Sequence, residues 1–257
     1  MNKLKFFSIF LLTAAMVYVW GCGDDTTTGG NNTGGTAPTI NMKVGNLYTF
    51  NLDSLDTNGS IRKTKVVTKH TYLAQGTYFG ESNAFQIESI TKDSTQSFNI
   101  STDTFYVRYD GGKFYQYGVL QLISPTIPAS WDLVADFNVA QGSQYTIKDN
   151  VPITLGTLTV TANIKGKIAA DTTFHTTAWG NIAVNCFRVE ITADLLLSGF
   201  PLGTVYVDYY IGDADPTSNP SGLVKTKLRP VKLPNTGTPI YSSPGVDQYL
   251  RQAVIVP

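Results

Sequence analysis

The 257-residue sequence is poor in the side chains that most metal sites and many enzymes use, with only two cysteines and two histidines. His70 and His175 lie far apart and have no short-spaced ligand partner, so zinc is not expected. Glutamate is scarce as well, because Glu81, Glu88 and Glu190 are the whole set. Three glutamates offer few ways to form the pair of neighbouring carboxyl groups that glycoside hydrolysis requires. We therefore expect no catalytic residues, no metal and no cofactor.

The common nucleophile and nucleotide motifs are also missing. The sequence contains no Gly-x-Ser-x-Gly elbow, no P-loop and no dinucleotide fingerprint. Cys186 beside a histidine would make a thiolate–imidazole pair. However, a cysteine between Asn185 and Phe187 on an alternating strand is typical of a small buried side chain. The sequence thus predicts a protein that is not an enzyme.

Two turns rich in aspartate and asparagine offer oxygen ligands for calcium as an alternative. They contain Asp53, Asp56 and Asn58 in one turn, and Asp213, Asp215 and Asn219 in the other. Neither follows the EF-hand order. Because such residues are ordinary turn formers, we predict no metal at either turn.

The charge is balanced, with 19 basic and 19 acidic side chains. Lys3 and Lys5 precede residue 22, so the chain from that point has 17 basic and 19 acidic side chains and a formal charge of −2. The basic residues are scattered singly, apart from the stretch 62–65. Nucleic-acid-binding proteins instead carry a basic stripe. We expect no nucleic-acid partner.

The first residues are typical of an export signal. Lys3 and Lys5 precede the uncharged apolar run 6–19, which is shorter than the about 20 residues that a membrane-spanning helix needs. Val19-Trp20-Gly21-Cys22 resembles the lipobox of bacterial lipoproteins, although Trp20 stands where a small residue is usual. The resemblance implies that 1–21 is a lipoprotein signal peptide and that Cys22 is lipidated.

A plain secretory signal with an incidental cysteine remains the alternative. Under the lipoprotein interpretation the protein is held in the cell envelope, as an outer-membrane lipoprotein that faces the periplasm or the cell surface. The membrane is then its expected partner, to which the N-terminal lipid attaches it. Cys186 would then have no second cysteine for a disulfide. The sequence gives no prediction of the oligomeric state.

Residues 22–36 are glycine, threonine, asparagine and aspartate apart from Cys22, with no apolar side chain to bury after it. We expect a flexible tether that spans on the order of 20 Å. Asp24 and Asp25 also resemble the surface-export signal of some Bacteroidetes-type lipoproteins.

Residues 37–257 are predicted to form a single antiparallel β domain with almost no helix, because threonine, valine, tyrosine and isoleucine alternate throughout. Asn58-Gly59 and 110–112 are turn sequences. The fold we expect is all-β, a large curved antiparallel sheet shaped like a half-barrel or barrel, with a β-sandwich as the alternative. In 181–197 the apolar alternation changes phase, which predicts a bulge near Cys186.

Expected strands follow the alternation along the whole domain. They are 44–52, 62–73, 83–91, 96–100, 104–110, 113–121, 133–138, 144–148, 153–169, 181–197, 203–211, 223–229 and 246–256. Pro125 and Pro128 predict a long connection over 124–132.

Three segments carry a family resemblance. They are Val44-Gly45-Asn46-Leu47-Tyr48-Thr49-Phe50, the stretch from Trp179 to Val189, and Tyr209-Tyr210 followed by Gly222-Leu223-Val224-Lys225. Together they resemble uncharacterised secreted bacterial lipoproteins of the Bacteroidetes and Chlorobi type. The resemblance implies a curved antiparallel sheet similar to that of periplasmic lipoprotein carriers. It implies no established activity.

Tyrosines that cluster on two predicted hairpins are the candidate ligand-binding residues. They are Tyr106, Tyr109, Tyr115, Tyr117, Tyr206, Tyr209 and Tyr210. One face of each hairpin is core, and the other can stack on sugars or line an apolar cavity. Cross-strand aromatic pairs that only stabilise the sheet are the alternative. We expect the protein to bind a lipid, another apolar ligand or a glycan; the alternative is a structural or adhesive surface protein without a ligand pocket.

Overall fold

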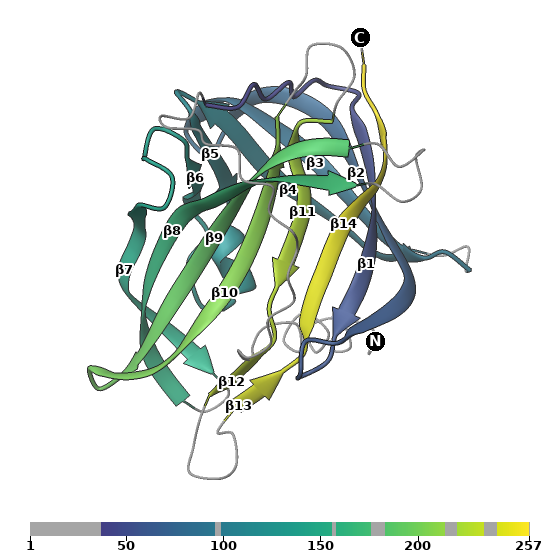
Figure 1. Cartoon of the computed structure of the whole chain (residues 1–257). Coiled ribbons are helices and arrows are strands. Elements are labelled where there is room, and N and C mark those ends of the chain that lie inside the picture. The colour runs from purple at the N-terminus through teal and green to yellow at the C-terminus, as the bar shows by residue number, and fades with distance from the viewer. Residues whose placement is uncertain are drawn as a thin grey trace.

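The computed structural model of the chain is an all-β structure in which twelve strands form one antiparallel sheet (Figure 1). It describes residues 37–95, 99–155, 158–175, 183–213, 220–233 and 241–256. The predicted signal peptide, Cys22 and tether lie outside these residues. In the part of the chain that is described, no helix is long and apolar enough to cross a membrane.

The chain builds two meanders that meet side by side. The first contains β1 (Leu47–Leu55), β2 (Ile61–Tyr78), β3 (Glu81–Asp93), β4 (Asn99–Asp110), β5 (Lys113–Tyr117) and β6 (Trp131–Asp136), with the 3-10 helix η1 (Val119–Leu122) after β5. The second contains β7 (Gln144–Leu155), β8 (Leu158–His175), β9 (Ala183–Leu197), β10 (Phe200–Gly212) and β11 (Gly222–Leu228). The last strand, β14 (Gly245–Val254), lies between β1 and β11 and joins the two meanders. β12 (Val231–Leu233) and β13 (Tyr241–Ser243) pair in a separate small sheet, and β12 packs against the core through Val231 and Leu233.

The sheet curves until its two edge strands approach each other, so it is nearly closed into a barrel (Figure 1). The predicted all-β class and curved antiparallel sheet are confirmed, and the sheet is not a sandwich. Both predicted turns are present, with positive φ at Gly59 (82°), Gly111 (55°) and Gly112 (76°). Pro125 and Pro128 lie in the connection between η1 and β6, as expected.

The predicted bulge near Cys186 is wrong in its position. Gly212 pairs with Cys186 and Ile211 with Phe187 without any shift in register. The irregularity lies on the neighbouring strand β8, between Ile168 and Ala170. Apolar residues occur in both alternation phases of β9 because both faces of the strand are covered there. Cys186 is buried on one face, and Phe187 on the opposite face packs against the core.

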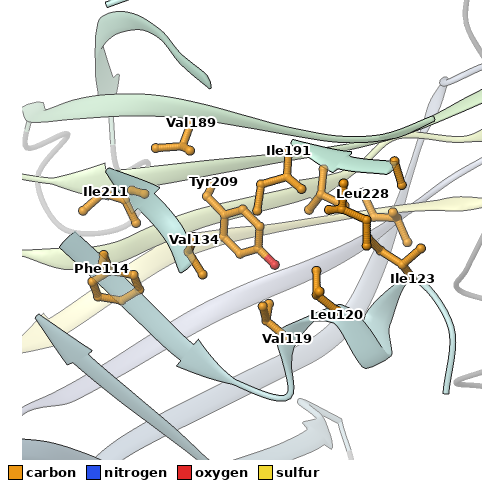
Figure 2. Packing of buried hydrophobic residues seen from close by; sticks show 14 of the residues in the cluster. Phe114, Val119, Leu120, Ile123, Val134, Val189, Ile191, Tyr209, Ile211 and Leu228 are labelled. Carbon is orange, nitrogen blue, oxygen red and sulfur yellow. The ribbon is translucent and has the colours of Figure 1, made fainter. Parts of the chain in front are cut away.

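The barrel interior is filled by apolar side chains from all around the wall and by the η1 turn. Figure 2 shows Leu120 and Ile123 of this turn pointing toward side chains of the second meander, among them Ile191 and Tyr209. Leu120 and Tyr209 are at most 2% exposed. The interior is therefore a packed core, stabilised by the removal of these apolar surfaces from water.

Residues 37–46, the N-terminal strap, cross the end of the barrel at which β1 begins (Figure 1). The hydroxyl of Tyr109 donates a hydrogen bond to the carbonyl of Pro38 at 2.7 Å. The backbone N–H of Asn41 donates to the hydroxyl of Ser221 at 2.7 Å. Because the predicted tether directly precedes the strap, it joins the domain at this end.

The seam between β6 and β7 is closed by side chains. The hydroxyl of Tyr145 on β7 donates to the carbonyl of Val134 on β6 at 2.7 Å. Lys148 on β7 forms an ion pair with Asp132 on β6, with its Nζ 3.0 Å from Oδ1. The other oxygen of Asp132 accepts a hydrogen bond from the backbone N–H of Leu120 at 3.3 Å. Asp132 thus holds both the seam and the η1 turn.

Candidate ligand-binding surfaces

The seven candidate tyrosines divide into three groups. Tyr106, Tyr115 and Tyr117 lie on the outer face of β4 and β5, Tyr206 and Tyr210 lie on the outer face of β10, and Tyr109 and Tyr209 point inward. The structure therefore forms no single site from all seven.

Tyr106 and Tyr117 of the first group belong to an aromatic patch that we define by Tyr78, Phe79, Tyr106, Tyr117 and Trp131. The rings of Phe79 and Tyr117 stack in parallel, with centroids 3.8 Å apart and an interplanar angle of 6°. Phe79 meets Tyr106 edge to face at 5.0 Å. Trp131 packs edge to face on Tyr117 at 5.6 Å. The five rings make one contiguous surface.

The tip of the β2–β3 hairpin places two of these rings over the outer face of the barrel. Phe79 and Gly80 both have positive φ, at 49° and 84°. The indole N–H of Trp131 donates to the carbonyl of Tyr78 at 3.3 Å. The hydroxyl of Tyr78 donates to the Gln86 side-chain oxygen at 3.3 Å. These bonds fix a hairpin tip that would otherwise project into solvent.

Polar groups border the patch on the Tyr115 side. The guanidinium of Arg108 lies over the Tyr115 ring, 4.4 Å from its centroid. Its Nη1 is 3.2 Å from Glu81 and 3.6 Å from Asp110. Phe79 is 54% exposed, so the patch presents an open apolar ring beside hydrogen-bonding groups. This combination suits a sugar, which has an apolar ring face and hydroxyls at its rim.

Tyr209 and Tyr109 have structural positions. Tyr209 is 2% exposed inside the barrel, and desolvation, with the charge of Asp132, raises its pKa well above the usual value. The Tyr109 hydroxyl is bound to the N-terminal strap. Neither ring is offered to a ligand at the outer surface.

Tyr206 and Tyr210 pair with cations on a different part of the barrel wall. The Arg229 guanidinium lies over Tyr206 at 4.9 Å, and Lys225 Nζ lies over Tyr210 at 5.1 Å. Arg229 also donates to both oxygens of Asp208, from Nε at 2.7 Å and from Nη2 at 2.6 Å. These rings are part of a charged surface rather than of the aromatic patch.

The residues considered for catalysis do not converge where their side chains are described, a set that leaves out His175. Glu88 lies on β3 and Glu190 on β9, with five strands between them in the sheet. His70 lies between the rings of Phe50 and Phe105, where desolvation lowers its pKa to about 3. The Cys186 thiol is buried and donates to the Val184 carbonyl at 3.2 Å.

The first calcium candidate has its oxygens engaged within the protein. Asp53 accepts hydrogen bonds from Lys63, Tyr249 and the backbone N–H of Thr64. Asp56 accepts from the backbone N–H groups of Asn58 and Ser60, as in an ordinary turn. Asp215 and Asn219 of the second candidate lie outside the described residues. In the described ranges, no three His, Cys, Asp or Glu side chains are grouped to hold a metal ion.

Sequence reasoning missed three members of the aromatic patch, namely Tyr78, Phe79 and Trp131. Phe79 before Gly80 was a usable signal, since a large aromatic residue at a turn is exposed unless a neighbour covers it. Comparison of the chain with protein-family models, with curated proteins and with solved structures finds no match.

Proposed function

We propose that the protein is an envelope lipoprotein, anchored through Cys22, whose β-barrel binds a glycan at the aromatic patch. The observation that carries the proposal is the exposed Phe79 ring, which is held parallel to Tyr117 on the outer face of a rigid sheet. The signal-like N-terminal sequence supports the location. The function is binding, and no catalytic step is part of it.

A glycan is favoured over an apolar ligand carried inside the barrel. The inward positions are occupied by a continuous core that includes Phe114, Leu120 and Tyr209. An apolar ligand would have to displace these side chains, at a cost of several kcal/mol. A sugar at the aromatic patch needs no such rearrangement, because Phe79 is already exposed.

In the structural or adhesive alternative, the protein meets other proteins through exposed sheet edges and loops. The two edge strands, β6 and β7, approach each other and are linked through Tyr145 and Lys148. This arrangement leaves little open edge at the seam for a partner strand. A glycan site on the outer face is therefore the better-supported function.

The test is titration of the full-length protein in detergent micelles with neutral hexasaccharides of glucose, xylose, mannose and N-acetylglucosamine. Binding is followed by calorimetry and by tryptophan fluorescence, since Trp131 is in the patch. We expect one of these sugars to bind, and Phe79→Ala to weaken binding about tenfold, which corresponds to ~1.4 kcal/mol.

Phe200→Ala is the matched control, because Phe200 is 75% exposed at the β9–β10 turn and outside the patch. This variant should bind as the parent protein does. Equal losses in Phe79→Ala and Phe200→Ala, or no binding of any hexasaccharide, would contradict the glycan function.

The anchor has its own test, which is labelling of cells with a radioactive or clickable palmitate. Cys22→Ser should abolish incorporation into the protein, whereas Cys186→Ser should keep it. Undiminished labelling of Cys22→Ser would refute the lipoprotein assignment without bearing on the glycan site.

A further inference from the structure

The outer face of the second meander gathers charged side chains that are far apart in the sequence. Strand register places one residue from each of six neighbouring strands, β8 to β1, in a single row. In order across the sheet, the row is Lys167, Glu190, Asp208, Lys227, Asp247 and Asp53. Directly opposite residues on neighbouring strands share a face, so these side chains form one continuous band.

A second row runs parallel to the first, two residues further along each strand. It contains Arg188, Tyr210, Lys225, Tyr249 and Asn51, again in direct register. A cation and an aromatic ring thus alternate over four strands. We call the outer face that carries both rows the basic wall.

Positive and negative groups of the basic wall are sorted by depth. The carboxylates lie against the sheet, with side-chain exposures of 3% for Asp53, 4% for Asp208 and 7% for Asp247. The cations above them are more open, at 17% for Lys225, 30% for Arg229 and 69% for Lys63. A molecule that approaches the wall therefore meets positive charge first.

The wall also holds a disproportionate share of the basic residues. On these six strands and at Arg229 just beyond β11, the cations are Lys165, Lys167, Arg188, Lys225, Lys227 and Arg229, and the facing acids are Asp53, Glu190, Asp194, Asp208 and Asp247. These groups sum to +1, and Lys63 and Lys69 on the adjoining strand β2 raise the sum to +3, although the chain after residue 21 has −2. An excess of one sign on one face attracts partners of the opposite sign.

We propose that the basic wall binds a linear acidic polysaccharide that runs across β9, β10, β11 and β14. Lys225 and Arg188 pair with its anionic groups, and the rings of Tyr210 and Tyr249 contact its sugar faces. Neighbouring strands lie about 4.8 Å apart, so cations in the tyrosine-containing row recur at about twice that spacing. A polymer with a regularly repeated charge matches such a row.

The alternating rings favour a polysaccharide over an anionic membrane surface, which would need the cations alone. The wall is also distinct from the aromatic patch, whose residues come from the β2–β3 tip, β4, β5 and β6. The inference therefore stands independently of the proposed neutral-glycan site.

The test is binding of the full-length protein in detergent micelles to polygalacturonate, with neutral dextran as the uncharged probe. The wall variant is Lys165→Gln/Lys227→Gln, for neither of which an ion pair is found among the described residues. Its matched control is Lys43→Gln/Lys92→Gln, which removes two positive charges outside the wall, again at lysines with no ion pair among the described residues. The third variant, Tyr210→Ala, leaves the charge unchanged.

We expect polygalacturonate to bind and dextran not to bind at the wall. The wall variant should bind polygalacturonate about tenfold more weakly, with a salt dependence smaller by roughly two counterions, while its control stays within about twofold. Tyr210→Ala should weaken binding severalfold, and Phe79→Ala should leave it unchanged.

Two results would overturn the proposal. One is an affinity for polygalacturonate that falls equally in the wall variant and in its control. The other is binding of anionic phospholipid vesicles or duplex DNA at least as tight as that of polygalacturonate, with Tyr210→Ala unaffected, which would indicate a surface that reads charge alone.

Discussion

Gly166 on β8 lies directly opposite Tyr145 on β7, and the tyrosine ring occupies the space where a β-carbon at position 166 would stand. The ring reaches across the glycine, so that its hydroxyl can donate to the Val134 carbonyl on β6. Closure of the barrel seam therefore depends on the absence of a side chain at position 166 of β8. This is a cross-strand pair in which glycine provides room for an aromatic ring.

Gly166→Ala should destabilise the protein by about 1–3 kcal/mol, the usual cost of added volume at a packed site. The new methyl group would displace the Tyr145 ring and break its bond to Val134. Urea unfolding measures the effect as a lower midpoint at unchanged slope.

The cause is isolated by repeating the substitution in a Tyr145→Ala background. There the methyl group meets no ring, so Gly166→Ala should cost little. If the cost is the same in both backgrounds, the ring is not the reason for the glycine.

The extent to which the fold follows from the sequence depends on the range of the interaction. Local alternation predicts the strands, and Asn58-Gly59 predicts a hairpin turn, because each of these signals is contained in a few consecutive residues. Which strands join the two meanders is a long-range matter, since Leu47 of β1 pairs with Val254 of β14. No local pattern contains that pairing, and the seam and strap were likewise not predicted.

The basic wall shows the same limit for the candidate surfaces. Along the sequence, Glu190, Asp208 and Lys227 are isolated charges, and this spacing argued against a polyanion-binding surface. In the sheet they are neighbours, because antiparallel register places them in one row. Phe79 differs, since its place beside Gly80 in a turn was visible locally. Sites built across strands are therefore harder to predict than sites built within one hairpin.

Arg229→Met should destabilise the protein by about 1.5–3 kcal/mol, because it removes the guanidinium that bonds two recessed carboxylates and leaves them only Lys167 and Arg188. Arg229 bonds both Asp208 oxygens, and its Nη2 lies 2.8 Å from Glu190. Burial alone would raise the pKa of Glu190, but Lys167 and Arg229 lower it overall. Arg229→Lys should fall in between, since an ammonium cannot make the two-pronged contact. A loss below about 1 kcal/mol for Arg229→Met would contradict this role.

Asp247→Asn should stabilise the protein at pH 7, by about 1 kcal/mol. Asp247 faces Asp53 on the next strand, and its Oδ1 is buried with no hydrogen-bond partner, although Lys225 Nζ is 3.7 Å away. Desolvation raises its pKa, so the folded state binds the proton more tightly than the unfolded state does.

The pH dependence of this gain gives its control. As the pH falls through the raised pKa, Asp247 becomes neutral in the folded protein, and the advantage of Asp247→Asn should shrink toward zero. Thermal unfolding of both proteins at pH 7 and pH 4 measures it. An advantage that is equal at the two pH values would show that the charge is not the cause.

The last prediction concerns His70, which is buried between Phe50 and Phe105 and has a pKa of about 3. An unfolded chain would protonate it near pH 6.5. Between these two pKa values the unfolded state binds the extra proton, so acid favours unfolding by about 1.4 kcal/mol per pH unit. The stability that neutral His70 supports is present above pH 6.5 and is lost as the pH falls toward 3.

His70→Gln removes this titration and keeps a polar side chain of similar length. Relative to this variant, the parent protein should lose about 2–3 kcal/mol of unfolding free energy between pH 6.5 and pH 4.5. The carboxylates titrate alike in both proteins, so their contribution cancels in the difference. Parallel stability curves over this interval would mean that His70 accepts a proton in the folded barrel, and that the aromatic pocket around it admits water.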